Sequence, residues 1–177
     1  PLVMDYTLGC DEQGKLTALQ ARIVGDTGAY ASVGMKVLER AAGHATGAYH
    51  VPVVDIESTA VYTNNIPNGA MRGFGVNQAV FAMESCVDEL CKQAGFDRWQ
   101  FRWDNALTEG SMTATGQVLT GGVGVRATLE AVRERFYAAR YAGLGCGIKN
   151  TGIGNGMPEA ASVRVTVAAP DRILIEH

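Results

Sequence analysis

The stretch Thr63–Gly75 constrains the fold of this 177-residue chain more than any other part of the sequence. It holds one proline and three glycines, which interrupt any regular helix or strand. Before it, residues 53–62 alternate toward a half-buried strand. After it, residues 77–94 carry apolar side chains at every third or fourth position, which is typical of an amphipathic helix. The pattern therefore predicts a shaped loop between a strand and a helix, which ends at Gly95.

The sequence before this loop predicts a hairpin and a short helix. Residues 2–8 and 15–24 are half-buried runs on either side of Asp11–Gly14, whose residue types favour a tight turn. Residues 37–42 follow a glycine-rich break and predict a short helix or a turn.

The sequence after the loop predicts further helices and then strands. Helices are expected at 97–107 and at 125–140, the second with Leu129, Val132 and Phe136 on one face. Strands are expected at 143–149, at 162–167 and from 173 onward. Because strands and helices do not alternate regularly, the predicted fold class is α+β, with mixed or antiparallel strands, rather than a Rossmann-like sheet.

Composition argues against several classes of protein. The formal net charge is −3 and no stretch concentrates Lys and Arg, so we expect no nucleic-acid partner. Four scattered cysteines without a C-x-x-C spacing indicate free, mostly buried thiols in a reducing compartment. Neither a signal peptide nor a membrane span is visible, so a soluble, cytoplasmic protein without a membrane partner is expected. The first and last residues resemble interior sequence, which predicts a fragment.

The loop Gly69–Gly75 is the best candidate for chemistry. Its glycines let backbone N–H groups approach an anion or an oxo ligand closely, and Arg72 adds a planar fork of donors. A phosphate, a pterin or a metal-oxo group would suit it, although an ordinary turn before a helix fits the same residues. Elsewhere, His44 and His50 have no third ligand nearby, so they are interpreted as core or surface residues.

Three motifs, in order, resemble the molybdenum-cofactor-binding subunit of the xanthine dehydrogenase/aldehyde oxidase family. They are Glu39–Ala41 with Tyr49–Pro52, then Thr63–Gln78, then Arg102–Ala106. The resemblance as a whole covers essentially the entire chain. The resemblance implies an oxidoreductase that hydroxylates purines or related N-heterocycles at a molybdopterin centre, with water as the oxygen source. It also implies that the chain is a fragment of one molybdopterin-binding domain. The length of the chain would also allow two small lobes, divided near residues 140–145.

The resemblance also implies roles for individual residues. Arg72, with Gly73 and Met71, would contact the molybdopterin, and Phe74 would lie flat against the substrate ring. Arg40 would hydrogen-bond an oxygen of the heterocycle and stabilise negative charge, as in purine-oxidising members. The alternative for Arg40 is a solvated helix arginine paired to a neighbour such as Glu39. No residue is expected to bind the metal directly.

The sequence departs from the family pattern at the substrate pocket. Asn155 and Gly156 stand near the positions where purine oxidases carry a second ring-sandwiching Phe and a Thr. A pocket without that aromatic wall would be more open and polar, which leaves an aldehyde or another heterocycle as an alternative substrate. The glycine-rich stretch at 152–156 is not expected to bind a nucleotide, since no Walker lysine appears.

The family's general-base glutamate, which follows a Gly-x-Gly-Glu pattern, has no counterpart in this sequence. The fragment is therefore expected to orient substrate, to be inactive alone and to bind no cofactor by itself. Iron–sulfur clusters and FAD are expected on other domains or subunits, and the remaining lobes of the parent enzyme are the expected partners. Apolar surfaces that normally meet those lobes would favour self-association. The remaining alternative is a non-catalytic binding module.

Overall fold

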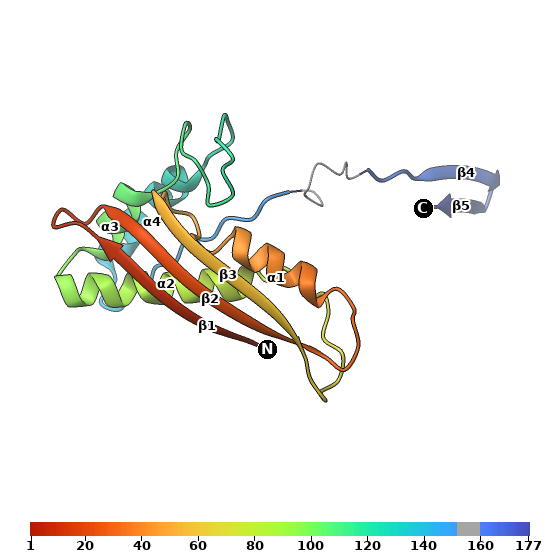
Figure 1. The fold of residues 1–177 in the computed structure, drawn as a ribbon. Helices are drawn as coiled ribbons and strands as arrows, with labels where there is room; N and C mark the ends of the chain where they lie inside the picture. The colour runs from red at the N-terminus through yellow and green to blue at the C-terminus, as the bar shows by residue number, and fades with distance from the viewer. Residues whose placement is uncertain (152–159) are drawn as a thin grey trace.

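The computed structural model describes residues 1–151 and 160–177. Its main sheet has the order β1 (Leu2–Cys10), β2 (Leu16–Gly28) and β3 (Val53–Tyr62), as Figure 1 shows. β1 and β2 form the predicted antiparallel hairpin, whereas β3 pairs with β2 in parallel. A parallel pair needs a crossover connection, and α1 (Gly34–Gly43) lies within it. The sheet is therefore mixed, and the predicted α+β class is confirmed.

Helices cover one side of this sheet. α2 (Val76–Ala94) contacts β1, and α1 contacts β2 and β3 (Figure 1). Leu19 and Ile23 of β2 are both buried in this core. They share one face of the strand because they are an even number of residues apart. The helix periodicity of the sequence matches the structure, since α2 buries its residues at intervals of three or four, namely Val76, Ala79, Met83, Val87 and Cys91.

Two further helices extend the core beyond the sheet. α3 (Arg98–Asn105) begins at Asp97, whose carboxylate accepts a hydrogen bond of 2.7 Å from the backbone N–H of Gln100. α4 (Val125–Ala138) packs against α3, with Leu129 buried as predicted. Val132 is expected on the same buried face but is 39% exposed, whereas Phe136, the third residue of that face, is partly buried against the core.

The prediction of a strand at 143–149 is wrong. Glycine occupies every second position at the start of this segment, which weakens a strand, and the segment pairs with no strand within residues 1–151 and 160–177. The segment instead lies along α2, with Gly145 beside Glu84 and Gly147 beside Val80. The intervening apolar residues Leu144, Cys146 and Ile148 pack on the core, so the alternation in the sequence reflects burial without strand pairing.

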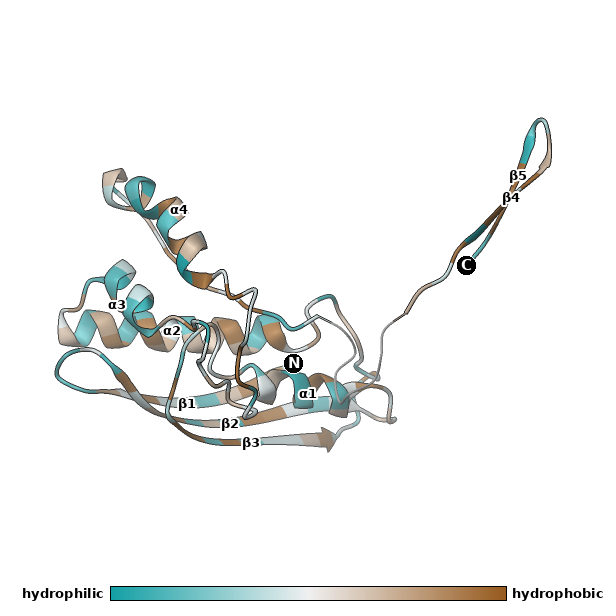
Figure 2. Cartoon of the chain, turned by 90° about the horizontal axis from the view of Figure 1, so that it is seen from above, coloured by the Kyte–Doolittle hydropathy of each residue, from teal (hydrophilic) through white to brown (hydrophobic). Residues whose placement is uncertain are grey.

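The two C-terminal strands form a separate hairpin, close to the predicted positions. β4 (Arg164–Ala169) pairs antiparallel with β5 (Arg172–Glu176), and Figures 1 and 2 show the hairpin apart from the main sheet. Val165 lies opposite Ile175 and Val167 opposite Ile173, so four branched apolar residues share one face. Each of them is at least 60% exposed, and a two-stranded ribbon is marginal in water. Self-association through apolar surface of this kind stays a prediction. The division into lobes near residues 140–145 stays a prediction.

In the part of the chain that the structure describes, no helix has the length and apolar character needed to cross a membrane.

Candidate cofactor and substrate site

The loop between β3 and α2 has an unusual backbone at the predicted cofactor-contacting residues. Gly73, Phe74 and Gly75 have φ angles of 97°, 54° and 92°, three positive values in succession. Among the described residues other than glycine, Phe74 alone has a positive φ. Such a conformation is costly for an aromatic residue and is found mainly where the surroundings fix it, often at functional sites. Phe74 is half-buried, whereas Met71 and Arg72 are exposed.

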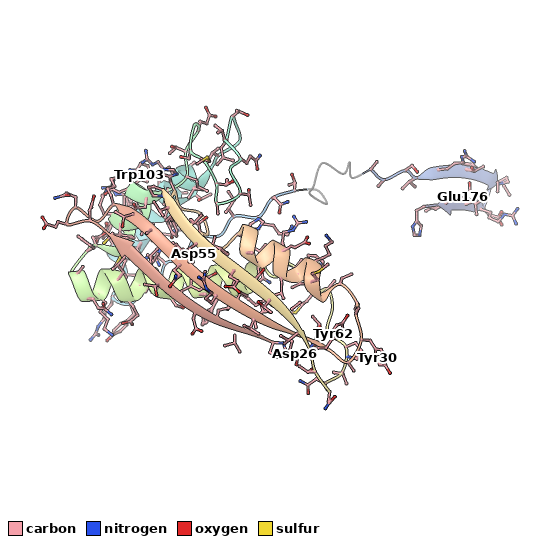
Figure 3. All side chains as sticks on the ribbon, viewed as in Figure 1. Asp26, Tyr30, Asp55, Tyr62, Trp103 and Glu176 are labelled. Atoms are coloured by element: carbon pink, nitrogen blue, oxygen red, sulfur yellow. The ribbon has the colours of Figure 1, made fainter. Side chains whose placement is uncertain are left out.

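Asp26, at the end of β2, holds the upstream part of this loop. Its carboxylate accepts hydrogen bonds from Thr63 Oγ1 (2.6 Å), Asn65 Nδ2 (2.5 Å) and the backbone N–H of Gly28 (2.8 Å). The donated bonds, that of Thr63 first, lower the pKa of Asp26 below its usual value. Figure 3 shows Asp26 beside Tyr62, where β2 and β3 end. The loop therefore leaves the sheet from a fixed starting point.

Two contacts hold the downstream part of the loop. Asn77 Nδ2 donates to the carbonyl of Arg72 at 3.0 Å. Gly75 lies directly against α1, because a Cβ built on it would overlap the Val37 carbonyl oxygen and would come within 3.2 Å of the backbone nitrogen of Ala41. Val37 and Ala41 stand on either side of Arg40 in the helix. The structure thus brings the backbone of the Met71–Gly75 loop next to the helix that carries Arg40.

Arg40 is half-buried and reaches across to a distant part of the chain. Its Nη1 donates to Oδ1 of Asn150 at 2.6 Å, a contact between residues 110 positions apart. Glu39, proposed from the sequence as a partner for Arg40, forms an ion pair with Lys36 at 2.9 Å. The contact with Asn150 places the segment after α4 beside the guanidinium.

His44, one turn further along the chain from Arg40, takes part in the same contact. Its Nδ1 lies 2.9 Å from the carbonyl oxygen of Arg40, and its Nε2 accepts the backbone N–H of Asn150 at 3.2 Å. Burial lowers the pKa of His44, and the positive charges of Arg40 and Lys149 add to this effect against the opposing hydrogen bond of the Arg40 carbonyl. Sequence reasoning missed Asn150, because no local pattern indicates a contact across 106 or 110 residues.

The sequence-based site residues therefore lie on two neighbouring elements and one segment outside the description. Arg40 is on α1, and Met71, Arg72, Gly73 and Phe74 are on the adjoining loop. Asn155 and Gly156 lie outside the described residues. That the side chains of Arg40, Arg72 and Phe74 face one cavity stays a prediction. A cavity of about 460 Å³ lies elsewhere, between α4 and the segment 144–148.

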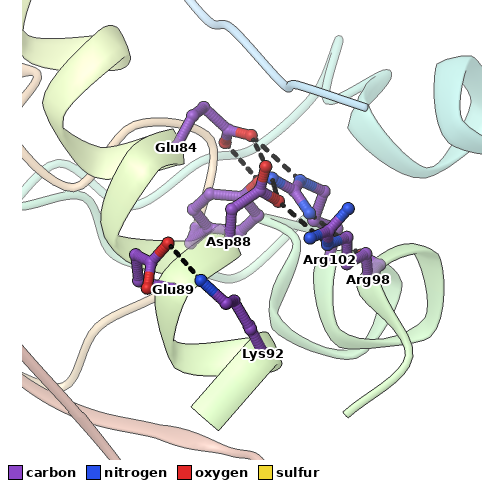
Figure 4. Close-up of polar contacts among 7 residues, drawn as sticks. Glu84, Asp88, Glu89, Lys92, Arg98 and Arg102 are labelled. Atoms are coloured by element: carbon purple, nitrogen blue, oxygen red, sulfur yellow. Dashed lines mark hydrogen bonds and ion pairs between the residues drawn. The ribbon is translucent and has the colours of Figure 1, made fainter. Parts of the chain in front are cut away.

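A buried ion-pair network fixes α2 against α3. Arg102, with no exposed side-chain surface, contacts Glu84 Oε2 at 2.8 Å and Asp88 Oδ1 at 2.9 Å (Figure 4). The hydroxyl of Tyr49 donates a hydrogen bond to the same Glu84 carboxylate. Burial, together with the negative charge of Glu84, raises the pKa of this hydroxyl. The network joins three stretches of chain and gives α2 a rigid position.

The start of α2 has donors that suit an anionic or oxo-bearing cofactor. Among the described residues no side chain caps this helix at Gly75, although the backbone N–H of Val76 donates to the Gly73 carbonyl at 3.1 Å. The positive end of the helix dipole at this point favours an anionic ligand. The exposed guanidinium of Arg72 precedes them. Within residues 1–151 and 160–177, no group of three or more His, Cys, Asp or Glu side chains could bind a metal ion.

The chain is similar to known proteins in both sequence and fold. The family model described as "Molybdopterin cofactor-binding domain" matches residues 1–106. A solved structure of the aldehyde oxidoreductase from Desulfovibrio gigas is similar to the chain with a TM-score of 0.74 and 26% identity, over 77% of this chain and 15% of that one.

Two curated relatives are similar in sequence. The nicotinate dehydrogenase large molybdopterin subunit of Eubacterium barkeri is 45% identical over 76% of this chain. A Bacillus subtilis protein, named as one subunit of a probable xanthine dehydrogenase, is 31% identical over 98% of it. The chain spans 32% and 25% of the lengths of these two relatives, so it corresponds to a part of each.

Proposed function

Because the chain belongs to the molybdopterin cofactor-binding domain family, we propose that it orients cofactor and substrate in a molybdenum hydroxylase of the xanthine dehydrogenase/aldehyde oxidase type. The whole enzyme would hydroxylate a nitrogen-containing aromatic ring. Two relatives support this interpretation by their names, one as part of a nicotinate dehydrogenase and the other as part of a probable xanthine dehydrogenase. Iron–sulfur clusters and FAD would belong to other domains or subunits of the same enzyme.

The loop before α2 would hold the cofactor. Its donors would be the guanidinium of Arg72 and the backbone N–H groups of Gly73 and Gly75, with Met71 beside them. The N–H groups of Phe74 and Val76 already donate to the carbonyls of Met71 and Gly73. When bound, a molybdopterin centre supplies the redox chemistry of hydroxylation, with water as the oxygen source. The residues of this chain would bind that centre and hold the substrate ring in a fixed orientation.

Arg40 and Phe74 would contact the substrate. The aromatic ring of Phe74, held in a strained backbone conformation, suits stacking on a planar heterocycle. The guanidinium of Arg40 offers several N–H donors and a positive charge to an oxygen atom on that heterocycle. Negative charge that develops on the ring during hydroxylation would be stabilised by the same guanidinium.

A purine is the first candidate substrate, because a guanidinium at the position of Arg40 matches the oxygen of a hydroxypurine. A pyridine carboxylate is the second candidate, since a carboxylate accepts the two-pronged donor set of arginine and the 45% identical relative is named for nicotinate. An aldehyde is a weaker candidate, since it carries no second polar group for Arg40 to bind.

The observation that carries the proposal is the packing of Gly75 against Val37 and Ala41, which brings the cofactor-type loop to the helix of Arg40. The test is to purify the complete parent enzyme and to assay hypoxanthine, nicotinate and benzaldehyde. In an Arg40→Met variant, kcat/KM for the preferred heterocycle should fall about a hundredfold. Lys36→Met, on the same helix and exposed, is the matched control and should change little.

Three results would contradict the proposal. Activity confined to aldehydes and unchanged by Arg40→Met would remove the heterocycle assignment. A loss as large in Lys36→Met as in Arg40→Met would remove the role of Arg40 itself. A parent protein that binds no molybdopterin and hydroxylates none of the three substrates would instead support a non-catalytic binding module.

A further inference from the structure

Asn150 is held from two sides by residues one helical turn apart. Arg40 and His44 are four residues apart, at the end of α1 and at its C-cap, so their side chains lie on the same face of the helix. Arg40 Nη1 donates to the side-chain oxygen of Asn150 at 2.6 Å, and the backbone N–H of Asn150 points at His44 Nε2 at 3.2 Å. We call this set of three residues the Asn150 clasp.

The clasp fixes the protonation state of His44. Because the backbone N–H of Asn150 can only donate, His44 Nε2 must accept and therefore carries no proton. The proton lies on Nδ1, which donates to the carbonyl of Arg40 at 2.9 Å. Protonation of Nε2 would set one N–H against another and break the contact with Asn150. Among the described residues, the charged groups that face His44 are Arg40 and Lys149, and both oppose a positive imidazole.

Asn150 also lies at the end of a segment that packs along α2. Gly145 lies beside Glu84 and Gly147 beside Val80, and the intervening Cys146 is buried. Lys149 Nζ donates to the carbonyl of Asn150 at 3.1 Å. The segment thus reaches Arg40 along a defined path, which gives Asn150 a fixed position from which to orient a guanidinium.

We propose that His44 and Asn150 are positioning residues that set the orientation of the Arg40 guanidinium toward the substrate. This rests on the proposed role of Arg40 in substrate binding. Asn150 orients one N–H edge of the guanidinium with an uncharged oxygen, so it adds no negative charge that would compete with an electron-rich substrate. His44 holds the backbone of Asn150 and so acts on Arg40 through it.

The expected signature is a pH-dependent KM. As pH falls and His44 takes up a proton, Asn150 loses its backbone contact and holds the Arg40 guanidinium less firmly, so substrate binds less tightly. The chemical step itself does not involve His44, so kcat should change less than KM.

The experiment uses the complete parent enzyme with hypoxanthine and nicotinate as substrates, at acid, intermediate and neutral pH. In His44→Gln, an amide oxygen replaces Nε2 as the acceptor and does not titrate, so the acid rise in KM seen in the wild type should disappear. His50→Gln is the matched control, because His50 contacts the carbonyl of Met112 and not the clasp. Asn150→Ala should raise KM about tenfold at every pH, with kcat within about threefold of the wild type.

A second measurement does not depend on turnover. Hydrogen exchange of peptides that cover residues 144–151, followed by mass spectrometry without substrate, should speed up in the wild type as the pH is lowered from neutral, after correction for intrinsic rates. It should not do so in His44→Gln.

The outcomes separate the two proposals. An active enzyme whose KM profile and corrected exchange are the same in wild type and His44→Gln would overturn the clasp and leave the proposed function intact. A parent enzyme that turns over neither heterocycle would overturn both. An equal change in His50→Gln would also overturn the clasp, because it would show a general effect of removing a histidine.

Discussion

Gly75 touches the backbone of Val37 so closely that a Cβ on the glycine would overlap the Val37 carbonyl oxygen. Real Cβ atoms do not come so near a backbone oxygen, and the φ of 92° at Gly75 adds a second barrier to any side chain. The contact explains how a loop with exposed tip residues keeps one position relative to α1. It is the joint between the two elements that carry the proposed site.

Replacing Gly75 by alanine should therefore force the loop away from α1. We expect a loss of about 3 kcal/mol in the free energy of unfolding, from left-handed backbone strain and from overpacking together. Gly95→Ala is the matched control, since Gly95 also has a positive φ but its Cβ would meet nothing within 4 Å; it should cost about 1 kcal/mol. Urea denaturation of the complete enzyme measures the loss of stability in each variant. Its molybdenum content measures whether the loop still holds the cofactor. Equal losses of stability in the two variants would contradict a special role for the contact between Gly75 and Val37.

Asp26→Asn should loosen the upstream end of the same loop. The three groups that face Asp26, from Thr63, Asn65 and Gly28, are all donors, and an asparagine would turn an N–H₂ group toward at least one of them. We expect faster limited proteolysis within residues 63–75 and less molybdenum bound per enzyme. Asp55→Asn is the control, since this exposed carboxylate on β3 pairs with Arg22 away from the loop (Figure 3). If the Asp26→Asn enzyme is cleaved no faster than the Asp55→Asn enzyme, Asp26 does not hold the upstream end of the loop.

Removing Arg102 should be far more damaging than removing an exposed cation on a neighbouring face of α2. Arg102→Met leaves Glu84, which is 13% exposed, without its buried partner, at a cost of about 3–5 kcal/mol. Lys92→Met removes a surface pair with Glu89, drawn in the same close-up in Figure 4, and should cost less than about 1 kcal/mol. Denaturant unfolding compares the two. A small loss in Arg102→Met would mean that the carboxylates find other partners.

Acid should destabilise the domain through His44. Its pKa in the folded state lies below the ordinary value of 6.5, so below that pH the unfolded chain binds the proton more readily. The stability that His44 contributes is present above pH 6.5 and is lost as pH falls from there through the lowered pKa. Between neutral and mildly acid pH the melting temperature of the wild type should fall more than that of His44→Gln. Melting temperatures that fall equally with pH in the wild type and in His44→Gln would contradict a contribution from His44.

Local patterns in the sequence predicted most of the elements. The hairpin, the loop at 63–75 and the helix that ends at Gly95 follow from turn residues and from periodicity, which depend on near neighbours alone. The parallel pairing of β3 with β2 could not be predicted, because alternation marks a buried face but does not identify a partner strand. The segment at 143–149 was mistaken for a strand for the same reason, since its alternating side chains pack on the core beside a helix.

The site was predicted less completely than the fold. Arg40 and the residues of the loop came from resemblance to a family, because a glycine-rich turn by its own chemistry fits many roles. The contacts that hold them were not foreseen: Asp26 with Asn65 across 39 residues, and Arg40 with Asn150 across 110. Contacts of this kind depend on how the chain crosses itself, which no short motif records.

The most direct measurement is a crystal structure of the complete enzyme with its molybdopterin and a bound heterocycle. We expect Arg72 and the backbone of Gly73 within hydrogen-bond distance of the cofactor, the ring of Phe74 stacked on the substrate, and Arg40 bonded to an oxygen of that substrate. A cofactor bound away from this loop, or Arg40 and Phe74 on surfaces that no single heterocycle can touch, would contradict the account.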